Sequence, residues 1–558
     1  MTKKILPFLF SLCGFLIITN TLAATQPKYT LIPTTPTTIT VSVSNINTMQ
    51  IQYRVTNQTK VTRTLTMSPI AGITQQTSSS DYCANPFMLA QGQSCLLTLS
   101  FVGTTLPGAI TSGPVVCAKQ ETDNIPDLFL CSQPSEADLL NITLAPAEVV
   151  SLSATPTHLL LYAASLTSNT ITVTNHSTDA IASNISAELA GTALANTVIQ
   201  DTSNCTSVLP GDTCTLTFMP KDTLVATSTV SIRGTNTTTV PVSITITYLP
   251  QAYLSGASSG PGIYQCPINT TNETLSACTN YSSTELTGSS AALNSPAGIA
   301  INLLSPTTTI NYAYIANTAN STVLQCSLNV VTGVLSSCLP TGSGTIGFST
   351  PLDIAINPNA MFAYITNNVV SSSGSGSIVQ CSIDANTGYL TGCIDSGIVL
   401  PNSGTPSGIA LSTINAVTYA YIASNTSAGL AASITKCTVN TSGTFSSCFS
   451  MTPLSFLTAV NAIAGITLNS TGTALYGTSP ASSLLFECLV NPSSGALSSC
   501  SSSLSTSLSV PSGIALYGSA ALVAANGTTY YQCPIPFSTS ACTAEGAPAP
   551  TLAIAVLK

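Results

Sequence analysis

The sequence predicts an all-β protein in which two β-sandwiches precede a six-bladed β-propeller with a disulfide in each blade. Two observations predict the propeller: a hairpin with a cysteine on each arm returns six times after residue 251, and two further strand patterns return with it. A third observation predicts the sandwiches: residues 24–250 contain two related segments of alternating polar and apolar residues, with their own closely spaced cysteines. Such period-two runs indicate half-buried strands.

The cysteine hairpin is clearest in residues 325–338, where two short strands flank a turn from Asn329 to Gly333. In an antiparallel pair the numbers of facing residues sum to a constant, so the two cysteines can face each other around Thr332 and form a cross-strand disulfide. The first cysteines of the six hairpins recur at intervals of 45–60 residues, a period typical of propeller blades. The predicted pairs are Cys266–Cys278, Cys326–Cys338, Cys381–Cys393, Cys437–Cys448, Cys488–Cys500 and Cys533–Cys542.

Each repeat also contains two other short strands. One has the pattern Gly-Ile-Ala, as in residues 297–301, and the next has the pattern Tyr-Ile-Ala, as in residues 312–317. With the two cysteine strands they make a four-stranded blade, the Gly-Ile-Ala strand innermost. The repeat region begins with a second strand at Ala252 and ends with a first strand at residues 552–557. We therefore predict that these two strands pair and close a ring of six blades without exposed edges.

Phrases such as Pro-Ser-Gly-Ile-Ala followed by Tyr-Ile-Ala-Asn resemble the NHL and YVTN-type β-propeller repeats of secreted and surface bacterial proteins. The resemblance covers residues 251–558. It implies a propeller fold and no particular activity, because propellers host many functions. The pair of cysteines in every blade departs from the usual pattern of this family.

The chain before the propeller is predicted to form two sandwiches, residues 24–147 and 148–250, and the first begins with an extended Thr- and Pro-rich lead-in to about residue 36. Segments 89–101 and 209–218 match, since each has Gly, one residue, Ser or Thr, Cys and then an alternating strand. About seven strands in ~100 residues is the size of an immunoglobulin-like sandwich. The pattern resembles the HYDIN and ASPM-SPD-2-type immunoglobulin-like domains of bacterial exported proteins.

Residues 1–23 have the features of a cleaved signal peptide: a start with two lysines, an apolar run from Ile5 to Ile18, and a small residue at Ala23. The apolar run is too short for a transmembrane helix, so we expect a secreted, periplasmic or cell-surface protein.

Loss of Cys13 with the signal peptide leaves 18 of the 19 cysteines, an even number that indicates disulfides in an exported protein. Zinc is a poor alternative, because the chain has two histidines and no Cys-x-x-Cys. The four cysteines of the first sandwich allow three pairings. The cysteines outside the propeller are Cys83, Cys95, Cys117, Cys131, Cys205 and Cys214.

Charge is sparse: charged residues are 5% of the chain, against roughly 25% in ordinary soluble proteins. The net charge of −8 argues against a nucleic-acid partner. The only histidines, His158 and His176, lie in the second sandwich, so a Ser-His-Asp arrangement within the propeller is excluded. Glu487 and Lys436 precede a blade cysteine, where other blades have Gln, and we expect both to be structural, with Asp384 forming a turn.

Asp353 stands out because it replaces the glycine of Gly-Ile-Ala at the start of an innermost strand. In a meander, the start of the first strand and the end of the second lie on the same face. Asp353 is therefore predicted to share one mouth of the channel with the residues that end the second strands, namely Asn317, Asn367, Asn425 and Asn526. One carboxylate with amide oxygens suits weak Ca²⁺ binding or recognition of hydroxyls. The alternative, which we favour, is that the asparagines bond local backbone.

These observations predict a secreted, non-enzymatic binding protein with a protein or glycan ligand, without catalytic residues or a cofactor. The alternative is a calcium-dependent hydrolase or lyase acting on a lactone-like small molecule. The calcium-dependent six-bladed lactonases use Asp, Glu and Asn in their channel, and this chain resembles them in residue type only. Such an enzyme needs several convergent carboxylates, whereas the sequence places only Asp353 there, so the acids that line the channel discriminate between the two hypotheses.

Overall fold

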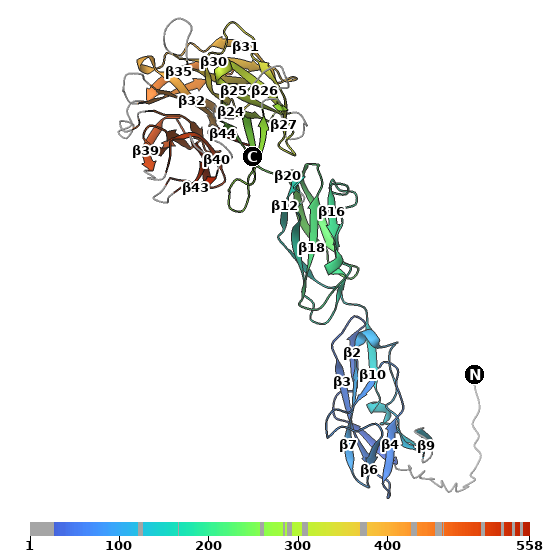
Figure 1. The fold of residues 1–558 in the computed structure, drawn as a ribbon. Helices are drawn as coiled ribbons and strands as arrows, with labels where there is room; N and C mark the ends of the chain where they lie inside the picture. Colours follow the sequence, from blue (N-terminus) through green and yellow to red (C-terminus); the bar gives the residue numbers. More distant parts are fainter. Residues whose placement is uncertain are drawn as a thin grey trace, which may run out of the picture.

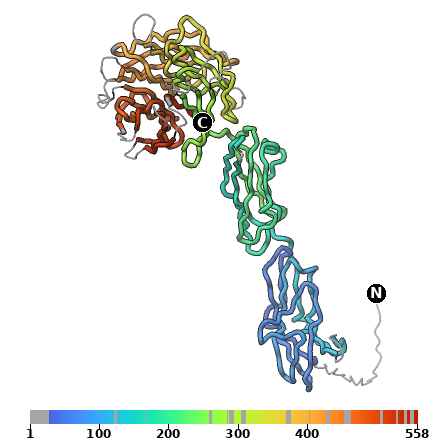
Figure 2. Tube along the Cα trace, in the orientation of Figure 1, coloured from blue at the N-terminus to red at the C-terminus, as the bar shows by residue number. Residues whose placement is uncertain are grey.

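The computed structural model describes residues 27–557 except 121–125, 166, 257–261, 283–284, 287–292, 304–310, 369–375, 426–431, 452–459, 461, 504–507, 526–528, 538–541 and 547–550. The predicted signal peptide and Asn526 lie outside the described residues. Two elongated units of β-strands lead from the N-terminal end to a larger ring of sheets (Figures 1 and 2). Short 3-10 helices connect some strands: η1 (Gly103–Thr105), η2 (Glu136–Asp138), η3 (Ser203–Cys205), η4 (Thr318–Asn320) and η5 (Pro401–Ser403).

The first unit has two four-stranded sheets and one parallel pair of strands. One sheet has the order β1 (Tyr29–Pro33), β3 (Met49–Asn57), β7 (Ser94–Phe101), β5 (Thr74–Gln76). The other has the order β6 (Phe87–Leu89), β4 (Arg63–Met67), β8 (Val116–Lys119), β9 (Pro126–Ser132), and the pair is β2 (Thr38–Ser42) with β10 (Asn141–Ala145). The predicted lead-in is wrong at residues 29–33, because Tyr29 and Leu31 alternate into the core and β1 pairs with β3.

The second unit also has two four-stranded sheets. Their orders are β11 (Leu152–Thr155), β13 (Asn169–Asn175), β18 (Thr213–Pro220), β16 (Val198–Asp201) and β12 (His158–Ala163), β20 (Val240–Tyr248), β19 (Val225–Arg233), β15 (Ser186–Ala187). A short pair, β14 (Ala182–Ser183) with β17 (Ser207–Val208), completes the unit.

A buried asparagine has the same role in both units. Asn57 donates from its amide to the carbonyls of Val61 and Leu89, at 2.9 and 2.8 Å. Asn175, at the equivalent end of β13, donates to the carbonyls of Ala180 and Val208, at 2.9 Å each. The shared hydrogen bonds support the view, first suggested by the sequence, that the two units are related.

Six four-stranded antiparallel sheets make up the described part of residues 251–557. In the first, β44 (Thr551–Leu557) is innermost and is followed outward by β21 (Gln251–Gly256), β22 (Gly262–Pro267) and β23 (Thr279–Ser282). The other five sheets follow the chain from inside to outside. They are β24 (Pro296–Asn302), β25 (Asn311–Asn317), β26 (Thr322–Leu328), β27 (Leu335–Thr341); β28 (Pro351–Ile356), β29 (Phe362–Asn367), β30 (Ser377–Ile383), β31 (Leu390–Asp395); β32 (Thr405–Ile414), β33 (Val417–Asn425), β34 (Ser433–Val439), β35 (Phe445–Met451); β36 (Ile466–Leu468), β37 (Ala474–Ser479), β38 (Leu484–Val490), β39 (Leu497–Ser503); and β40 (Pro511–Tyr517), β41 (Ala520–Ala525), β42 (Thr529–Pro534), β43 (Thr543–Gly546).

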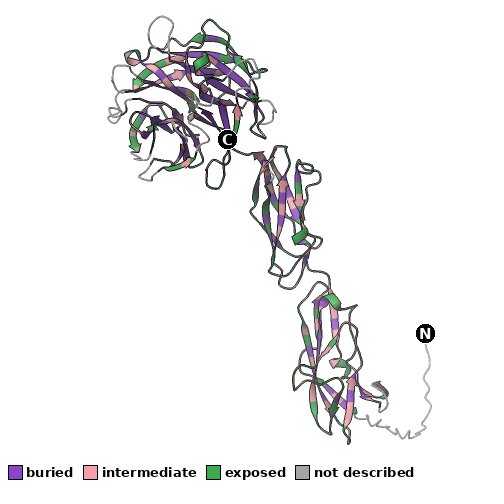
Figure 3. Ribbon diagram, viewed as in Figure 1, coloured by how far each residue is buried: buried purple, intermediate pink, exposed green. Residues whose placement is uncertain are grey.

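The ring is a β-propeller closed by its two ends. The last strand, β44, pairs antiparallel with β21 from the start of the ring, with Val556 opposite Ala252 and Ile554 opposite Leu254. This pairing confirms the closure predicted from the two unmatched strands. Buried residues are concentrated in the strands of the ring (Figure 3), and every residue of the second strands β21, β25, β37 and β41 is buried.

All nine disulfides of the described chain join cysteines that are close in sequence. In the ring, each links the two arms of one hairpin, with Cα atoms 3.9–4.3 Å apart, as the spacing predicted. In the first unit the pairs are Cys83–Cys95 and Cys117–Cys131, which selects one of the three possible pairings.

Neighbouring sheets of the ring share a repeated contact, which we call the inter-sheet contact. A tyrosine on the second strand of one sheet donates its hydroxyl to a glycine carbonyl in the hairpin turn of the next sheet. The four examples are Tyr253 to Gly333, Tyr314 to Gly388, Tyr364 to Gly443 and Tyr421 to Gly495. In four of the six sheets, the turn of the disulfide hairpin therefore also binds the neighbouring sheet.

The residue before the first cysteine reinforces the inter-sheet contact. Gln265, Gln325 and Gln380 donate to the turn carbonyls of Thr332, Thr387 and Ser442 in the next sheet. Lys436 donates in the same way to the carbonyl of Ser494, at 2.9 Å, and the Glu487 carboxylate accepts from the Phe537 N–H, at 2.9 Å. These contacts support the structural role predicted for Lys436 and Glu487.

Candidate functional site

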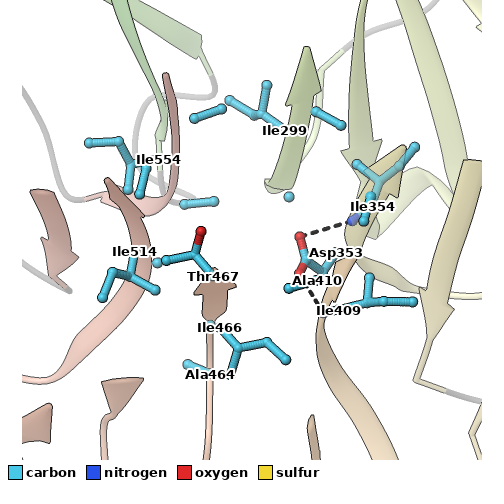
Figure 4. A pocket seen from close by; sticks show the side chains of 18 of the residues that line it. Ile299, Asp353, Ile354, Ile409, Ala410, Ala464, Ile466, Thr467, Ile514 and Ile554 are labelled. Atoms are coloured by element: carbon cyan, nitrogen blue, oxygen red, sulfur yellow. Dashed lines mark hydrogen bonds between the residues drawn. The ribbon is translucent and has the colours of Figure 1, made fainter. Parts of the chain in front are cut away.

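The innermost strands of the six sheets surround a cavity of about 790 Å³ on the axis of the ring (Figure 4). Each of them, β24, β28, β32, β36, β40 and β44, pairs on one side only. The other edge of each strand, with its backbone N–H and C=O groups, faces the axis. The volume lies in the range of small-molecule sites, which makes this cavity the candidate site.

Glycines let the innermost strands approach one another closely at one end of the cavity. A Cβ atom on Gly513 would lie 2.6 Å from the Cα atom of Ala553, and one on Gly298 would lie 2.6 Å from the Cα atom of Asp353. Such distances leave no room for a side chain. The Gly-Ile-Ala pattern of the sequence therefore reflects packing around the axis.

Among the described residues of the cavity wall, Asp353 alone has an ionisable side chain. Its two carboxylate oxygens accept hydrogen bonds from the N–H groups of Ile354 in its own strand and Ile409 in the next sheet, at 2.9 Å each (Figure 4). The side chain keeps some exposure to the cavity, but the surrounding protein removes most of its water, and this burial raises its pKa to about 7. The two N–H groups oppose the shift without cancelling it.

Thr467 is the second polar departure from the repeat in this wall. It occupies the alanine position of Gly-Ile-Ala on β36, which is separated from the strand of Asp353, β28, by β32, and its hydroxyl is directed into the open space (Figure 4). The sequence contains this signal, since Gly-Ile-Thr stands where other repeats have Gly-Ile-Ala. Reasoning from ionisable residues alone missed it.

The predicted asparagines separate into two groups. Asn425 lines the cavity, and its amide oxygen accepts from the Ile463 N–H at 2.8 Å while its amide nitrogen donates to the Ile463 carbonyl at 2.9 Å. Asn317 and Asn367 are buried and lie outside the cavity wall, where their amide oxygens accept from the N–H groups of Asn294 and Ser349. These bonds to backbone are the capping role that we favoured.

The remaining candidates have local partners. Asp384 accepts from the N–H groups of Asn386 and Thr387, at 3.0 and 2.8 Å, in the turn where we expected it. His158 and His176, in the second unit, are exposed and bond the hydroxyls of Ser243 and Ser153. Neither arrangement resembles a catalytic site.

Two other kinds of feature are absent from the described residues. No three His, Cys, Asp or Glu side chains in this part of the chain gather closely enough to hold a metal ion. Among the helices that the structure describes, none has the length and apolar character needed to cross a bilayer.

Comparison with known proteins identifies no relative by sequence: no protein-family model and no curated protein matches this chain. Several solved structures are similar in shape. The periplasmic gluconolactonase of Pseudomonas aeruginosa is 11% identical, with 56% of this chain and 99% of that chain covered and a TM-score of 0.37. A protein from Lactobacillus plantarum is 16% identical, covering 56% and 100%, with a TM-score of 0.36.

An auxiliary nutrient binding protein from Bacteroides thetaiotaomicron is 8% identical, with 71% of this chain and 85% of that chain covered and a TM-score of 0.34. The low identities and TM-scores assign this chain no activity. Its fold is defined by its own strand pairing.

Proposed function

We propose that this chain is an exported, non-enzymatic binding protein. In this proposal two immunoglobulin-like domains carry a six-bladed propeller of the NHL and YVTN type, and the central cavity of the propeller is the ligand site. The nine disulfides support a location outside the cytoplasm, in the periplasm, at the cell surface or in the medium. The signal peptide proposed for residues 1–23 is the route of export.

The observation that carries this proposal is the composition of the cavity wall. Its residues are mainly aliphatic, with some Ser, Thr and Asn side chains, one carboxylate, Asp353, and no second ionisable side chain among the described residues. Hydrolysis or elimination by acid–base catalysis needs one positioned group that transfers a proton. It usually needs a second group that activates the nucleophile or stabilises the charge that develops. A wall of this kind suits binding.

We propose a protein or a glycan as the ligand. Of these two, the cavity favours a protein, because it suits a molecule with an aliphatic part. No aromatic side chain occurs among the described residues of the wall. A sugar ring bound there would have no aromatic face against which to pack. Partly exposed aliphatic residues of the wall, such as Leu352, Ala355 and Val556, offer apolar contact instead.

A calcium-dependent hydrolase or lyase acting on a lactone is the second candidate, favoured by the presence of Asp353 in a cavity. Calcium takes six to eight oxygen ligands, usually including several carboxylates. Here the described wall offers a single carboxylate, Asp353, and the amide oxygen of Asn425 already accepts an N–H group. The donors of the described wall therefore do not fit calcium.

One experiment separates the two candidates. The mature chain is assayed for hydrolysis of gluconolactone with calcium and with a chelator, and in parallel it is screened for binding to protein and glycan panels. We expect binding and no calcium-dependent hydrolysis. Calcium-dependent turnover that disappears in Asp353→Gly would replace the binding proposal by the enzyme.

A further inference from the structure

The innermost strands depart from their own repeat with a polar side chain at two places that face the same cavity. At the glycine position, Asp353 stands where four other sheets have Gly298, Gly408, Gly465 and Gly513. At the alanine position, Thr467 stands where five others have Ala300, Ala355, Ala410, Ala515 and Ala555. The glycines and alanines that recur in most of the sheets serve the packing of the ring. Asp353 and Thr467 are not required for it, because the other sheets pack with Gly and Ala.

Asp353 brings a carboxylate into this cavity without a balancing positive charge. Within the described residues, no Lys, Arg or His lines the wall. Lys436, the described basic residue of the ring, lies on an outer strand, where it bonds Ser494 and stacks over Tyr419. The carboxylate is stabilised only by two neutral N–H donors, and each oxygen keeps lone pairs for a further donor. A bound cation would supply the missing charge.

The wall also limits the kind of cation. A divalent metal lacks ligands, as shown above. A quaternary ammonium is normally recognised by an aromatic cage, and this wall has no aromatic side chain among its described residues. A primary ammonium needs neither, because its three N–H groups bond directly to a carboxylate and a hydroxyl. The aliphatic wall would then cover an aliphatic body.

We propose that the central cavity binds a primary ammonium group carried on an aliphatic chain, such as a free alkylamine or the lysine side chain of a partner protein. The Asp353 carboxylate accepts hydrogen bonds from the ammonium, the Thr467 hydroxyl is directed into the same cavity, and partly exposed aliphatic residues such as Leu352 and Val556 cover the alkyl chain. This inference rests on the proposed function, since it names the ligand chemistry of the same site.

Binding of this kind depends on the ionisation of Asp353. Its pKa, raised to about 7 by burial, means that the carboxylate is charged above pH 7 and neutral below it. The elements packed against it carry tyrosines as their ionisable groups, namely Tyr312 and Tyr314 on β25 and Tyr364 on β29, and burial raises the pKa of each above 10. These tyrosines stay neutral across this range, and β24 and β32 carry no ionisable side chain.

The test is isothermal titration calorimetry of the full mature chain with n-hexylammonium at about pH 8. The controls are n-hexanol, hexyltrimethylammonium and n-hexanoate, and Nα-acetyl-lysine amide represents the lysine source. Asp353→Gly restores the residue of four other sheets and removes the carboxylate, so its fold should be kept, and Thr467→Ala restores the alanine of the repeat. Near-ultraviolet circular dichroism checks both variants. If Asp353→Gly does not fold, Asp353→Asn replaces it.

We expect hexylammonium or the lysine probe to bind, and Asp353→Gly to weaken that binding by at least about tenfold, the loss of one charge-assisted hydrogen-bonded pair. Binding at about pH 6 should be roughly tenfold weaker than at pH 8, because about one carboxylate in ten is then ionised. Thr467→Ala should weaken binding to a smaller extent.

Two results would overturn the inference. If hexanol binds as well as hexylammonium, and Asp353→Gly keeps both, the cavity binds apolar chains without recognising charge, and only the proposed function survives. If no amine probe binds the folded wild-type chain, the ligand class is wrong. The protein and glycan screen then decides the proposed function separately.

Discussion

The contribution of the inter-sheet contact to stability can be measured by removing a single hydroxyl oxygen. Tyr364 is fully buried, and its hydroxyl donates to the carbonyl of Gly443, itself buried, at 2.6 Å. Tyr364→Phe removes the donor, keeps the ring of the side chain and leaves the carbonyl without this partner. A buried polar group left unpaired costs about 1–3 kcal/mol, so we expect the free energy of unfolding of the ring to fall by that amount.

Four such tyrosines occur in the ring, and they lie in different sheets. If distant contacts add, replacing all four by Phe costs about 4–12 kcal/mol, which approaches the whole stability of ~5–15 kcal/mol of a typical protein. The fourfold variant should therefore not form a stable ring.

The assay is urea denaturation of the mature chain followed by near-ultraviolet circular dichroism, which reports on tyrosines, since the chain has 18 of them and no tryptophan. Tyr389→Phe is the matched control, because Tyr389 is 39% exposed and its hydroxyl has no hydrogen-bond partner among the described residues. The control should stay within about 0.5 kcal/mol of wild type. Equal effects of Tyr364→Phe and Tyr389→Phe would refute the reasoning.

Three further predictions follow from the ring. Deleting residues 551–558 removes β44 with its buried Leu557 and exposes the edge of β21, so the melting temperature of the ring should collapse, and an unchanged value would contradict the closure. Burial raises the pKa of Asp353 from 3.8 to about 7, so the contribution of its protonated carboxyl group to stability is complete below about pH 4 and is lost as the pH rises through 7. Wild type should therefore lose stability relative to Asp353→Asn between pH 4 and pH 7. A constant difference in stability between the two proteins would argue against the raised pKa. Replacing both cysteines of the Cys381–Cys393 hairpin by Ala should cost roughly 3 kcal/mol in the chain-entropy model, and peptide mapping without reduction should find only pairs within one hairpin.

The sequence by itself determined those features of this protein that depend on spacing along the chain. Cys326 and Cys338 pair because a hairpin of that length brings its own arms together, whatever surrounds it. The pairing of β44 with β21 followed from two unmatched strands and from the need to cover an edge. The burial of Tyr29 and Leu31, which makes residues 29–33 strand β1, was not foreseen, because two apolar residues are too short a pattern to reveal a strand.

The tertiary structure alone decided which side chains meet on the axis. Asp353 and Thr467 are 114 positions apart in numbering (467 − 353), and they line one cavity because the ring turns their strands toward a common axis. The same geometry turns Asn317 and Asn367 away from that cavity, although the sequence gives all the asparagines equivalent positions. The raised pKa of Asp353 likewise comes from its burial in the folded ring. The spacing of residues determines which side chains meet within one hairpin, whereas closure of the ring determines which side chains from different sheets meet.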